Sequence, residues 1–157
     1  MHILIRAATF DDVDVITEFN CRLAQETENR ILNRKTVDAG VRRGLELGDE
    51  VQYFVAENEA GVIGQIMLTR EWSDWRNGEF WWLQSVYVHA EFRRRGIFRR
   101  LMQHVNDLAK STPGVVGLRL YMANDNRNAQ QTYERCGFQF EHYVVGEQIL
   151  SEAHRLS

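Results

Sequence analysis

The sequence predicts an α/β fold in which helices flank a mixed central β-sheet. Two observations lead to this prediction. Helical stripes of apolar residues alternate along the chain with short segments rich in strand-forming residues. Two of those segments, residues 80–88 and 115–122, are apolar almost throughout, as in strands that are buried on both faces. Helices packed against such a sheet bury the apolar faces of both layers.

The N-terminal part predicts one strand followed by two helices. Residues 3–8 have roughly alternating apolar positions and predict a strand. A helix is expected over residues 9–28, because Thr9 and Asp12 approximate a capping box and an apolar stripe follows at spacings of three and four. A second helical stripe predicts a helix over residues 36–47.

The middle of the chain predicts a hairpin and then a buried strand. Residues 52–57 and 62–69 are rich in strand formers, and the turn residues 58–61 separate them. The polar and aromatic residues 72–78 predict a loop, and residues 80–88 predict the buried strand that follows it.

The C-terminal part continues the alternation of helices and strands. A helix is predicted over residues 97–110, and the only proline, Pro113, breaks it. Residues 115–122 predict a strand, and residues 129–136 predict a short helix. Strand-like sequence over residues 138–148 completes the predicted order.

Length and composition indicate an ordinary globular protein. The 157 residues suit one domain covering residues 1–157, with 44% apolar and 26% charged residues. The net charge of −3 argues against a general nucleic-acid coat, so no nucleic-acid partner is expected. No apolar run approaches the roughly 20 residues of a membrane span, and the N-terminal residues lack a signal-peptide core. We therefore expect a cytoplasmic protein with no membrane partner.

The potential metal ligands show no metal-binding pattern. Cys21 and Cys136 have no Cys-x-x-Cys spacing, which argues against a disulfide framework and against a zinc site. The five histidines have no metal spacing either. We therefore expect no metal.

The most informative segment is residues 86–101, where a buried strand runs through a short turn into a helix. The turn carries three arginines and Gly96 just before the helix. A helix start leaves backbone N–H groups without partners and carries partial positive charge, so anions bind there. Gly96 has no side chain to keep a phosphate from the backbone. The segment is therefore a candidate diphosphate cradle; the alternative is a solvated, arginine-rich helix start.

Two motifs carry a resemblance to a known family. Residues 93–98, RRRGIF, resemble the Q/R-x-x-G-x-G/A signature of GNAT-type N-acetyltransferases. Residues 126–138 resemble that family's N-x-x-A-x-x-x-Y-x-x-x-G-F element. The resemblance implies the family's acyl-CoA N-acyltransferase fold over nearly the whole chain. Phe98 stands where the family usually has Gly or Ala, and we expect its side chain to point into the core.

The resemblance implies acetyl-coenzyme A as the acyl donor. Main-chain groups of one strand would pair with the pantetheine arm, the turn amides would hold the pyrophosphate, and an asparagine would reach the pantetheine side. The implied cofactor-binding residues are Val86, Val88, Arg93, Arg94, Arg95, Gly96, Ile97, Phe98, Arg99 and Asn126.

The resemblance also implies a reaction, direct attack of a primary amine on the thioester. A main-chain N–H near Val88 is the candidate donor to the oxyanion. Tyr133 would lie near the sulfur and protonate the leaving thiolate; the alternative is a core tyrosine. Glu79 is the candidate base, directly or through water, with Glu26 and Glu28 as other possible bases; each is otherwise a surface acid.

The acceptor is expected to be a small-molecule or peptide amine. Trp72, Asp74 and Trp75, together with Glu26 at the end of the first helix, could form an aromatic and acidic site for a cationic amine. The two tryptophans could instead cover the sheet or form the contact of a homodimer. An alternative function is a non-catalytic acyl-CoA-binding or sensor protein with the same fold.

Overall fold

The computed structural model describes residues 1–140 and 143–156. The chain forms two compact units, residues 1–120 and residues 121–157, and each is described here by itself. The expectation of a single domain over residues 1–157 stays a prediction.

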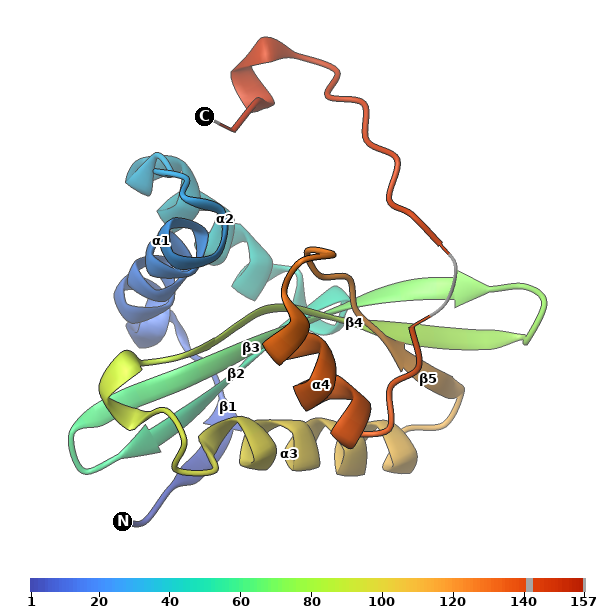
Figure 1. The fold of residues 1–157 in the computed structure, drawn as a ribbon, viewed down its shortest axis with the longest axis horizontal. Helices are drawn as coiled ribbons and strands as arrows, with labels where there is room; N and C mark the ends of the chain where they lie inside the picture. Colours follow the sequence, from blue (N-terminus) through green and yellow to red (C-terminus); the bar gives the residue numbers. More distant parts are fainter. Residues whose placement is uncertain (141–142, 157) are drawn as a thin grey trace. The chain divides into compact units, whose positions relative to one another are not determined.

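The first unit is built on a five-stranded sheet in the order β1-β2-β3-β4-β5 (Figure 1). Neighbouring strands from β1 to β4 are antiparallel, whereas β4 and β5 are parallel, so the predicted mixed sheet is confirmed. The strands are β1 (Leu4–Ala7), β2 (Val51–Asn58), β3 (Gly61–Ser73), β4 (Gly78–Val88) and β5 (Val115–Arg119).

Three helices cover the two faces of this sheet. α1 (Val13–Glu28) and α2 (Arg34–Glu46) pack together on one face, and α3 (Ile97–Ser111) lies on the other (Figure 1). Alternation along β3 separates the two faces: Gln65 bonds to Asn20 of α1, whereas Gly64 lies against α3.

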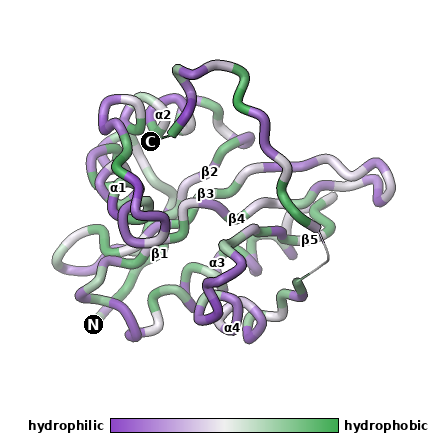
Figure 2. The backbone as a smooth tube through the Cα atoms, turned by 45° about the horizontal axis from the view of Figure 1, so that its top comes forward, coloured by the Kyte–Doolittle hydropathy of each residue, from purple (hydrophilic) through white to green (hydrophobic). Residues whose placement is uncertain are grey.

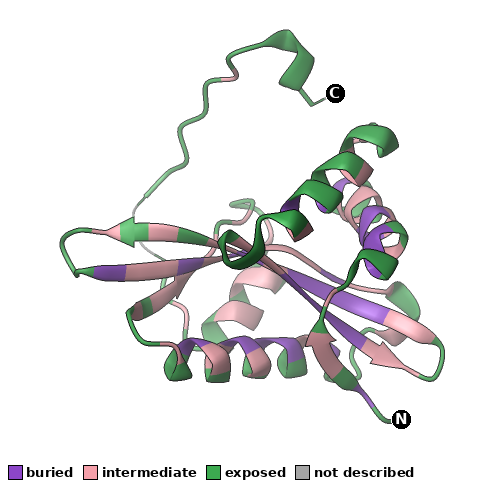
Figure 3. Cartoon of the chain, turned by 180° about the vertical axis from the view of Figure 1, so that it is seen from behind, coloured by how far each residue is buried: buried purple, intermediate pink, exposed green. Residues whose placement is uncertain are grey.

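The packing of α3 fixes the start of that helix against the sheet. Its buried residues lie on the side that faces the strands (Figure 3). A Cβ placed on Gly64 would lie 3.2 Å from a methyl carbon of Ile97 and 3.2 Å from the carbonyl oxygen of Tyr87. Gly64 therefore lets the first turn of α3 approach β3 closely. The buried residues of α3 are Ile97, Leu101, Met102, Val105 and Ala109.

The second unit contains one α-helix, α4 (Arg127–Arg135), in the part of it that the structure describes. The side chain of Asn126 caps this helix by accepting the N–H of Ala129 at 3.2 Å. The predicted strand over residues 138–148 is wrong for residues 138–140 and 143–148, none of which is in a strand, and residues 141–142 lie outside the described residues. Strand-forming composition cannot by itself supply the neighbouring strand that a ladder requires.

Three predicted boundaries also differ from the structure. The loop expected over residues 72–78 is shorter, because β3 runs to Ser73 and β4 begins at Gly78. The strand expected to reach residue 122 ends at Arg119 and is not fully buried. α2 begins before residue 36, because Asn33 caps it by accepting the N–H of Thr36 at 3.0 Å.

Among the described residues, no helix is long and apolar enough to cross a bilayer. Residues 1–140 and 143–156 also contain no group of three or more His, Cys, Asp or Glu side chains placed to hold a metal ion. The expected cytoplasmic location stays a prediction.

A charged cluster joins the N-terminal strand to the entry of α1. Arg6 donates hydrogen bonds of 2.7 and 2.9 Å to the carboxylate of Asp12 and one of 2.8 Å to Glu57. Asp12 also accepts the N–H of Thr9 at 2.8 Å, and the expected capping box of Thr9 and Asp12 is confirmed. The hydrogen bonds from Arg6 lower the pKa of Asp12 although burial opposes them.

The free energy of unfolding should therefore fall as the pH drops below about 4. In the unfolded chain an Asp has a pKa of about 3.9, which is higher than the pKa of Asp12 in the folded chain. The unfolded chain therefore takes up the proton more readily, and protonation favours unfolding. Replacing Asp12→Asn should destabilise the protein by about 2 kcal/mol at pH 7 and flatten this pH dependence. Urea unfolding between pH 3 and pH 7 measures both. Asp11→Asn, at an exposed neighbouring position, is the matched control. An unchanged pH profile in Asp12→Asn would contradict this account.

Candidate functional site

The turn between β4 and α3 has the geometry of an anion site. A short 3-10 helix (Ala90–Phe92) follows β4, and Arg94 and Gly96 then take left-handed backbone angles, with φ of 62° and 80°. The first hydrogen bond of α3 runs from the N–H of Arg100 to the carbonyl of Gly96 at 3.1 Å. The start of α3 thus presents N–H groups that the helix itself cannot satisfy.

Two features of Gly96 bear on the predicted cradle. Its φ of 80° disfavours any residue that has a Cβ, and a Cβ built there would meet nothing within 4 Å. The space beside the backbone is therefore open, so a ligand can approach the amides closely. Both features support the predicted diphosphate cradle.

The second feature of the site is an open edge of β4. The pairing of β4 with β5 ends at Trp82 and Arg119, so residues after Trp82 have no partner on β5. The N–H of His89 bonds to the carbonyl of Ile63 on β3 at 2.9 Å. Because main-chain groups alternate along a strand, the N–H of Val88 points to the opposite, open edge.

A β-bulge lies where this open edge begins. Between the pairs Gln65–Tyr87 and Met67–Gln84, β4 contains one more residue than β3. Ser85 takes a left-handed φ of 52° within this bulge. The bulge reorients the main chain of β4 within the open edge.

The side chain of Gln65 holds the bulge in place. It is fully buried, and its amide nitrogen donates to the carbonyl of Ser85 at 3.0 Å and to the side-chain oxygen of Asn20 at 2.9 Å. Gln65 therefore satisfies a carbonyl that the bulge removes from the β-ladder and connects it to α1.

Arg93 and Glu26 connect the end of α1 to the same turn. Arg93 donates to the carbonyl of Val88 at 2.8 Å and to the carboxylate of Glu26 at 2.5 Å, and it stacks over the ring of Tyr87. Tyr87 donates its hydroxyl to Glu26 at 2.9 Å. Burial raises the pKa of Glu26, but the bonds from Arg93 and Tyr87 outweigh it and lower the pKa overall. Glu26 is thus held as a paired carboxylate, which suits neither a base nor a free acceptor ligand.

The remaining residues of the turn differ in how far their side chains are exposed to solvent. Arg94, Arg95 and Arg99 are exposed, so their side chains can reach an anion at the turn. Ile97 is buried in the core, whereas Phe98, which was expected to point into the core, is only half-buried. Beyond the turn, Arg100 donates to the carbonyl of Ile3 at 2.9 Å and so fastens α3 to the N-terminal segment.

Two further candidates, Asn126 and Tyr133, lie in the second unit. Asn126 is the cap of α4. Tyr133 is half-buried, and its ring packs edge-on against Phe138 with 5.6 Å between the ring centroids. Desolvation, with a contribution from Cys136, raises the pKa of Tyr133 to about 12. The phenol therefore keeps its proton throughout the neutral range.

The other candidates lie at the far end of the β3–β4 hairpin. Trp72 and Trp75 are 63% and 88% exposed near the hydrophilic tip of the hairpin, close to Asp74 (Figure 2). Glu79 pairs across the strands with Trp72 and forms an ion pair with Arg70 at 3.4 Å. The pair of Trp72 and Glu79 is five residues along β3 from Met67 at the bulge, or about 17 Å. The structure therefore does not bring these four residues to the open edge of β4.

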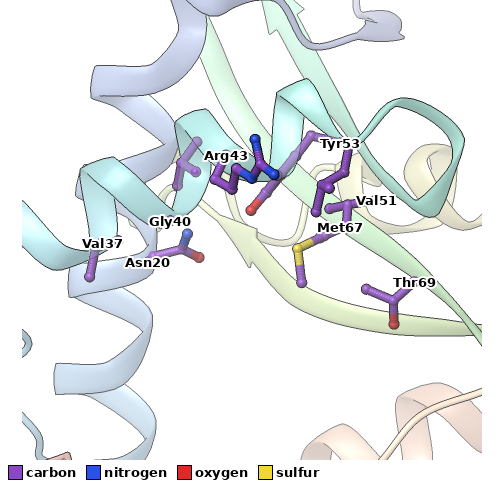
Figure 4. Close-up of a pocket in the computed structure, with 11 residues that line it drawn as sticks. Asn20, Val37, Gly40, Arg43, Val51, Tyr53, Met67 and Thr69 are labelled. Atoms are coloured by element: carbon purple, nitrogen blue, oxygen red, sulfur yellow. The ribbon is translucent and has the colours of Figure 1, made fainter. Parts of the chain in front are cut away.

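A cavity of about 420 Å³ lies on the α1/α2 face of the sheet (Figure 4). It is bounded by α2, by β2 and β3, and by Asn20 of α1. The residues of the hairpin tip do not line it.

Sequence reasoning missed the residues that support the bulge. Gln65 is the clearest case, because it is a single polar residue within the apolar run of β3. A polar residue in a strand that is otherwise buried must find hydrogen-bond partners, which was a readable signal. Tyr87, which donates to Glu26, gave no comparable signal, because tyrosine is common in strands.

Comparisons with known proteins identify the family of this chain. The family described as Acetyltransferase (GNAT) domain matches residues 49–140. A possible acetyltransferase from Clostridium difficile is 40% identical, with a TM-score of 0.89 over 97% of this chain and 100% of that one. An uncharacterised N-acetyltransferase of Methanocaldococcus jannaschii is 25% identical over 90% of this chain, which spans 63% of that protein's length.

A predicted acetyltransferase from Clostridium acetobutylicum, solved with acetyl-CoA, is 16% identical to this chain. Its TM-score is 0.76 over 98% of this chain and 100% of that one, so the two share the fold. The family match covers more than half of the chain, and the fold agrees with it. The protein belongs to the GNAT acetyltransferase family.

Replacing Gln65→Met should destabilise the protein by about 1–3 kcal/mol, because the half-buried carbonyl of Ser85 loses its donor while the side-chain volume is nearly kept. Urea unfolding measures the change. Gln52→Met, the same substitution on β2, is the control and should stay within about 0.5 kcal/mol of the parent. Equal stability of the two variants would show that Gln65 does not hold the bulge.

Proposed function

We propose that the protein transfers an acetyl group from acetyl-CoA to a primary amine of a small molecule or peptide by direct attack. This proposal rests on the combination of two neighbouring features. One is the open edge of β4, and the other is a helix start that has Gly96 in a left-handed conformation. The first feature suits an extended amide-bearing chain, and the second suits a diphosphate. Coenzyme A contains both.

Different groups of the chain would bind different parts of the donor. Main-chain groups of Val86 and Val88 would pair with the pantetheine amides, and the amides from Arg94 to Arg99 would hold the pyrophosphate. The exposed side chains of Arg94, Arg95 and Arg99 add positive charge at this turn. Asn126 would contribute from the pantetheine side, as its motif implies. Arg93 acts differently, because it is bonded to Val88 and Glu26 and so positions the turn.

Acetyl-CoA supplies an activated thioester carbon when it is bound. Attack by the amine nitrogen forms the C–N bond, and the C–S bond then breaks. The N–H of Val88 faces the open edge and would donate to the carbonyl oxygen as negative charge develops there. Tyr133 would give its proton to the leaving thiolate. Its raised pKa, about 12, keeps that proton available.

The proton of the attacking amine requires no carboxylate close to the bulge. Glu79 is in an ion pair on the hairpin, and Glu26 is held by two donors. We therefore propose that the amine enters neutral and releases its proton to water after attack. A further carboxylate would be needed only if the bound amine were charged.

Replacing Gly96→Glu should abolish coenzyme A binding, because a side chain and a negative charge would enter the cradle. Coenzyme A at about 100 times its Kd should raise the Tm of the parent protein by about 5–10 °C, and it should not raise that of Gly96→Glu. Gly114→Glu is the control, since Gly114 has a similar φ of 86° and open space at the other end of α3. An equal shift in all three proteins would contradict the placement of the cradle.

Replacing Tyr133→Phe should lower kcat by about 100-fold and leave the Kd for coenzyme A within about twofold. Release of free thiol from acetyl-CoA measures kcat, and calorimetry measures the Kd. In the parent, kcat should not decline through deprotonation of Tyr133 below about pH 11, because the pKa of the phenol is about 12. Tyr143→Phe, at an exposed position, is the control. Equal losses in kcat and in affinity would indicate a purely structural tyrosine.

A further inference from the structure

The cavity on the α1/α2 face is connected by hydrogen bonds to the bulge of β4. Thr69 lines the cavity, and its hydroxyl accepts the amide of Gln84 at 2.7 Å. Asn20 also lines it and accepts the same Gln65 amide that holds Ser85. Thr69 of the cavity wall is therefore bonded to Gln84, which flanks the bulge, and Asn20 is linked to Ser85 of the bulge through Gln65. A molecule in the cavity would have one end close to the bulge within the open edge of β4.

The chemistry of the cavity wall selects against a polycationic occupant. Most of the wall is apolar, and the described residues that line it include neither Asp nor Glu. A polyamine or an aminoglycoside would lose hydration of its ammonium groups there without gaining a carboxylate. An apolar body would gain contact with the residues Val37, Val41, Leu47, Val51, Tyr53 and Met67.

One charged residue lies at the cavity, and it is a cation. Arg43 of α2 lines the cavity near Tyr53 (Figure 4). It forms an ion pair with Glu46 at 3.0 Å, but both side chains are more than half exposed, so this pair is weak. The guanidinium therefore keeps donors that can bind a carboxylate or a phosphate.

We propose that this cavity is the acceptor site, and that the acceptor is a primary amine carrying an apolar body and an anionic group. The amine would face the bulge, the apolar body would lie under α2, and the anionic group would bind Arg43. This inference rests on the proposed function for the identity of the reaction, but the binding of the acceptor can be tested without turnover.

Gly40 allows the cavity to be filled with little risk to folding. It lines the cavity within α2, and a Cβ built there meets nothing within 4 Å. Replacing an interior helical glycine by another residue favours the helix. Gly40→Phe should therefore obstruct the cavity in a folded protein, and Gly40→Ala is its matched control. Circular dichroism and Tm check the fold of each variant.

The experiment measures binding of phenylalanine, 2-phenylethylamine and spermidine by calorimetry. Phenylalanine should bind more tightly than 2-phenylethylamine, and spermidine should bind least. Gly40→Phe should weaken the first two by about 10-fold or more, whereas Gly40→Ala should change them by less than about twofold. Arg43→Gln should weaken phenylalanine by about 10-fold and leave 2-phenylethylamine unchanged. Arg42→Gln, which neutralises the neighbouring arginine that does not line the cavity, is the control for charge.

The outcomes separate this inference from the proposed function. Tightest binding by spermidine, or binding of phenylalanine that Gly40→Phe does not change, overturns the acceptor assignment. If acetylation is then observed with cationic amines, the proposed function stands alone. Cavity binding as expected but no thiol release with any of the three amines would overturn the proposed function and retain the cavity as a ligand site.

Discussion

The site depends on a departure of β4 from regular pairing. A strand in the middle of a sheet normally has its main-chain groups satisfied on both edges. In this protein β4 is paired with β5 only as far as Trp82, and a bulge at Ser85 then changes its course. Unpaired main-chain groups are costly unless they reach water or a ligand. The open edge is consequently both a structural liability and the feature that makes the strand able to bind an extended ligand.

Polar side chains compensate for that departure. Gln65 bonds to the carbonyl of Ser85, and Arg93 bonds to the carbonyl of Val88. Both side chains also reach α1, through Asn20 and Glu26. α1, which contributes Asn20 to the cavity wall, is thus bonded through these side chains to two places where β4 lacks ladder partners.

Charge also divides the first unit into two kinds of surface. The turn before α3 exposes Arg94, Arg95 and Arg99, although the chain as a whole is acidic with a net charge of −3. The cavity on the opposite face is apolar and has one arginine at its wall. A donor rich in phosphate and an acceptor with an apolar body would therefore be attracted to different places by different forces. In the proposed function, this separation would keep one substrate from occupying the place of the other.

The sequence by itself determined the order of elements from β1 to α4 and the position of the glycine turn. Those features depend on local patterns: apolar periodicity for the helices and strands, and Gly96 for a left-handed residue before a helix. It did not determine that residues 72–73 continue β3, that residues 143–148 form no strand, or that the hairpin residues lie about 17 Å from the bulge. Strand pairing, bulges and cavities join residues that are distant in the chain, and no local pattern records which strand or helix supplies the partner. Only the tertiary structure decided that Glu26 pairs with Arg93 and that Gln65 supports Ser85.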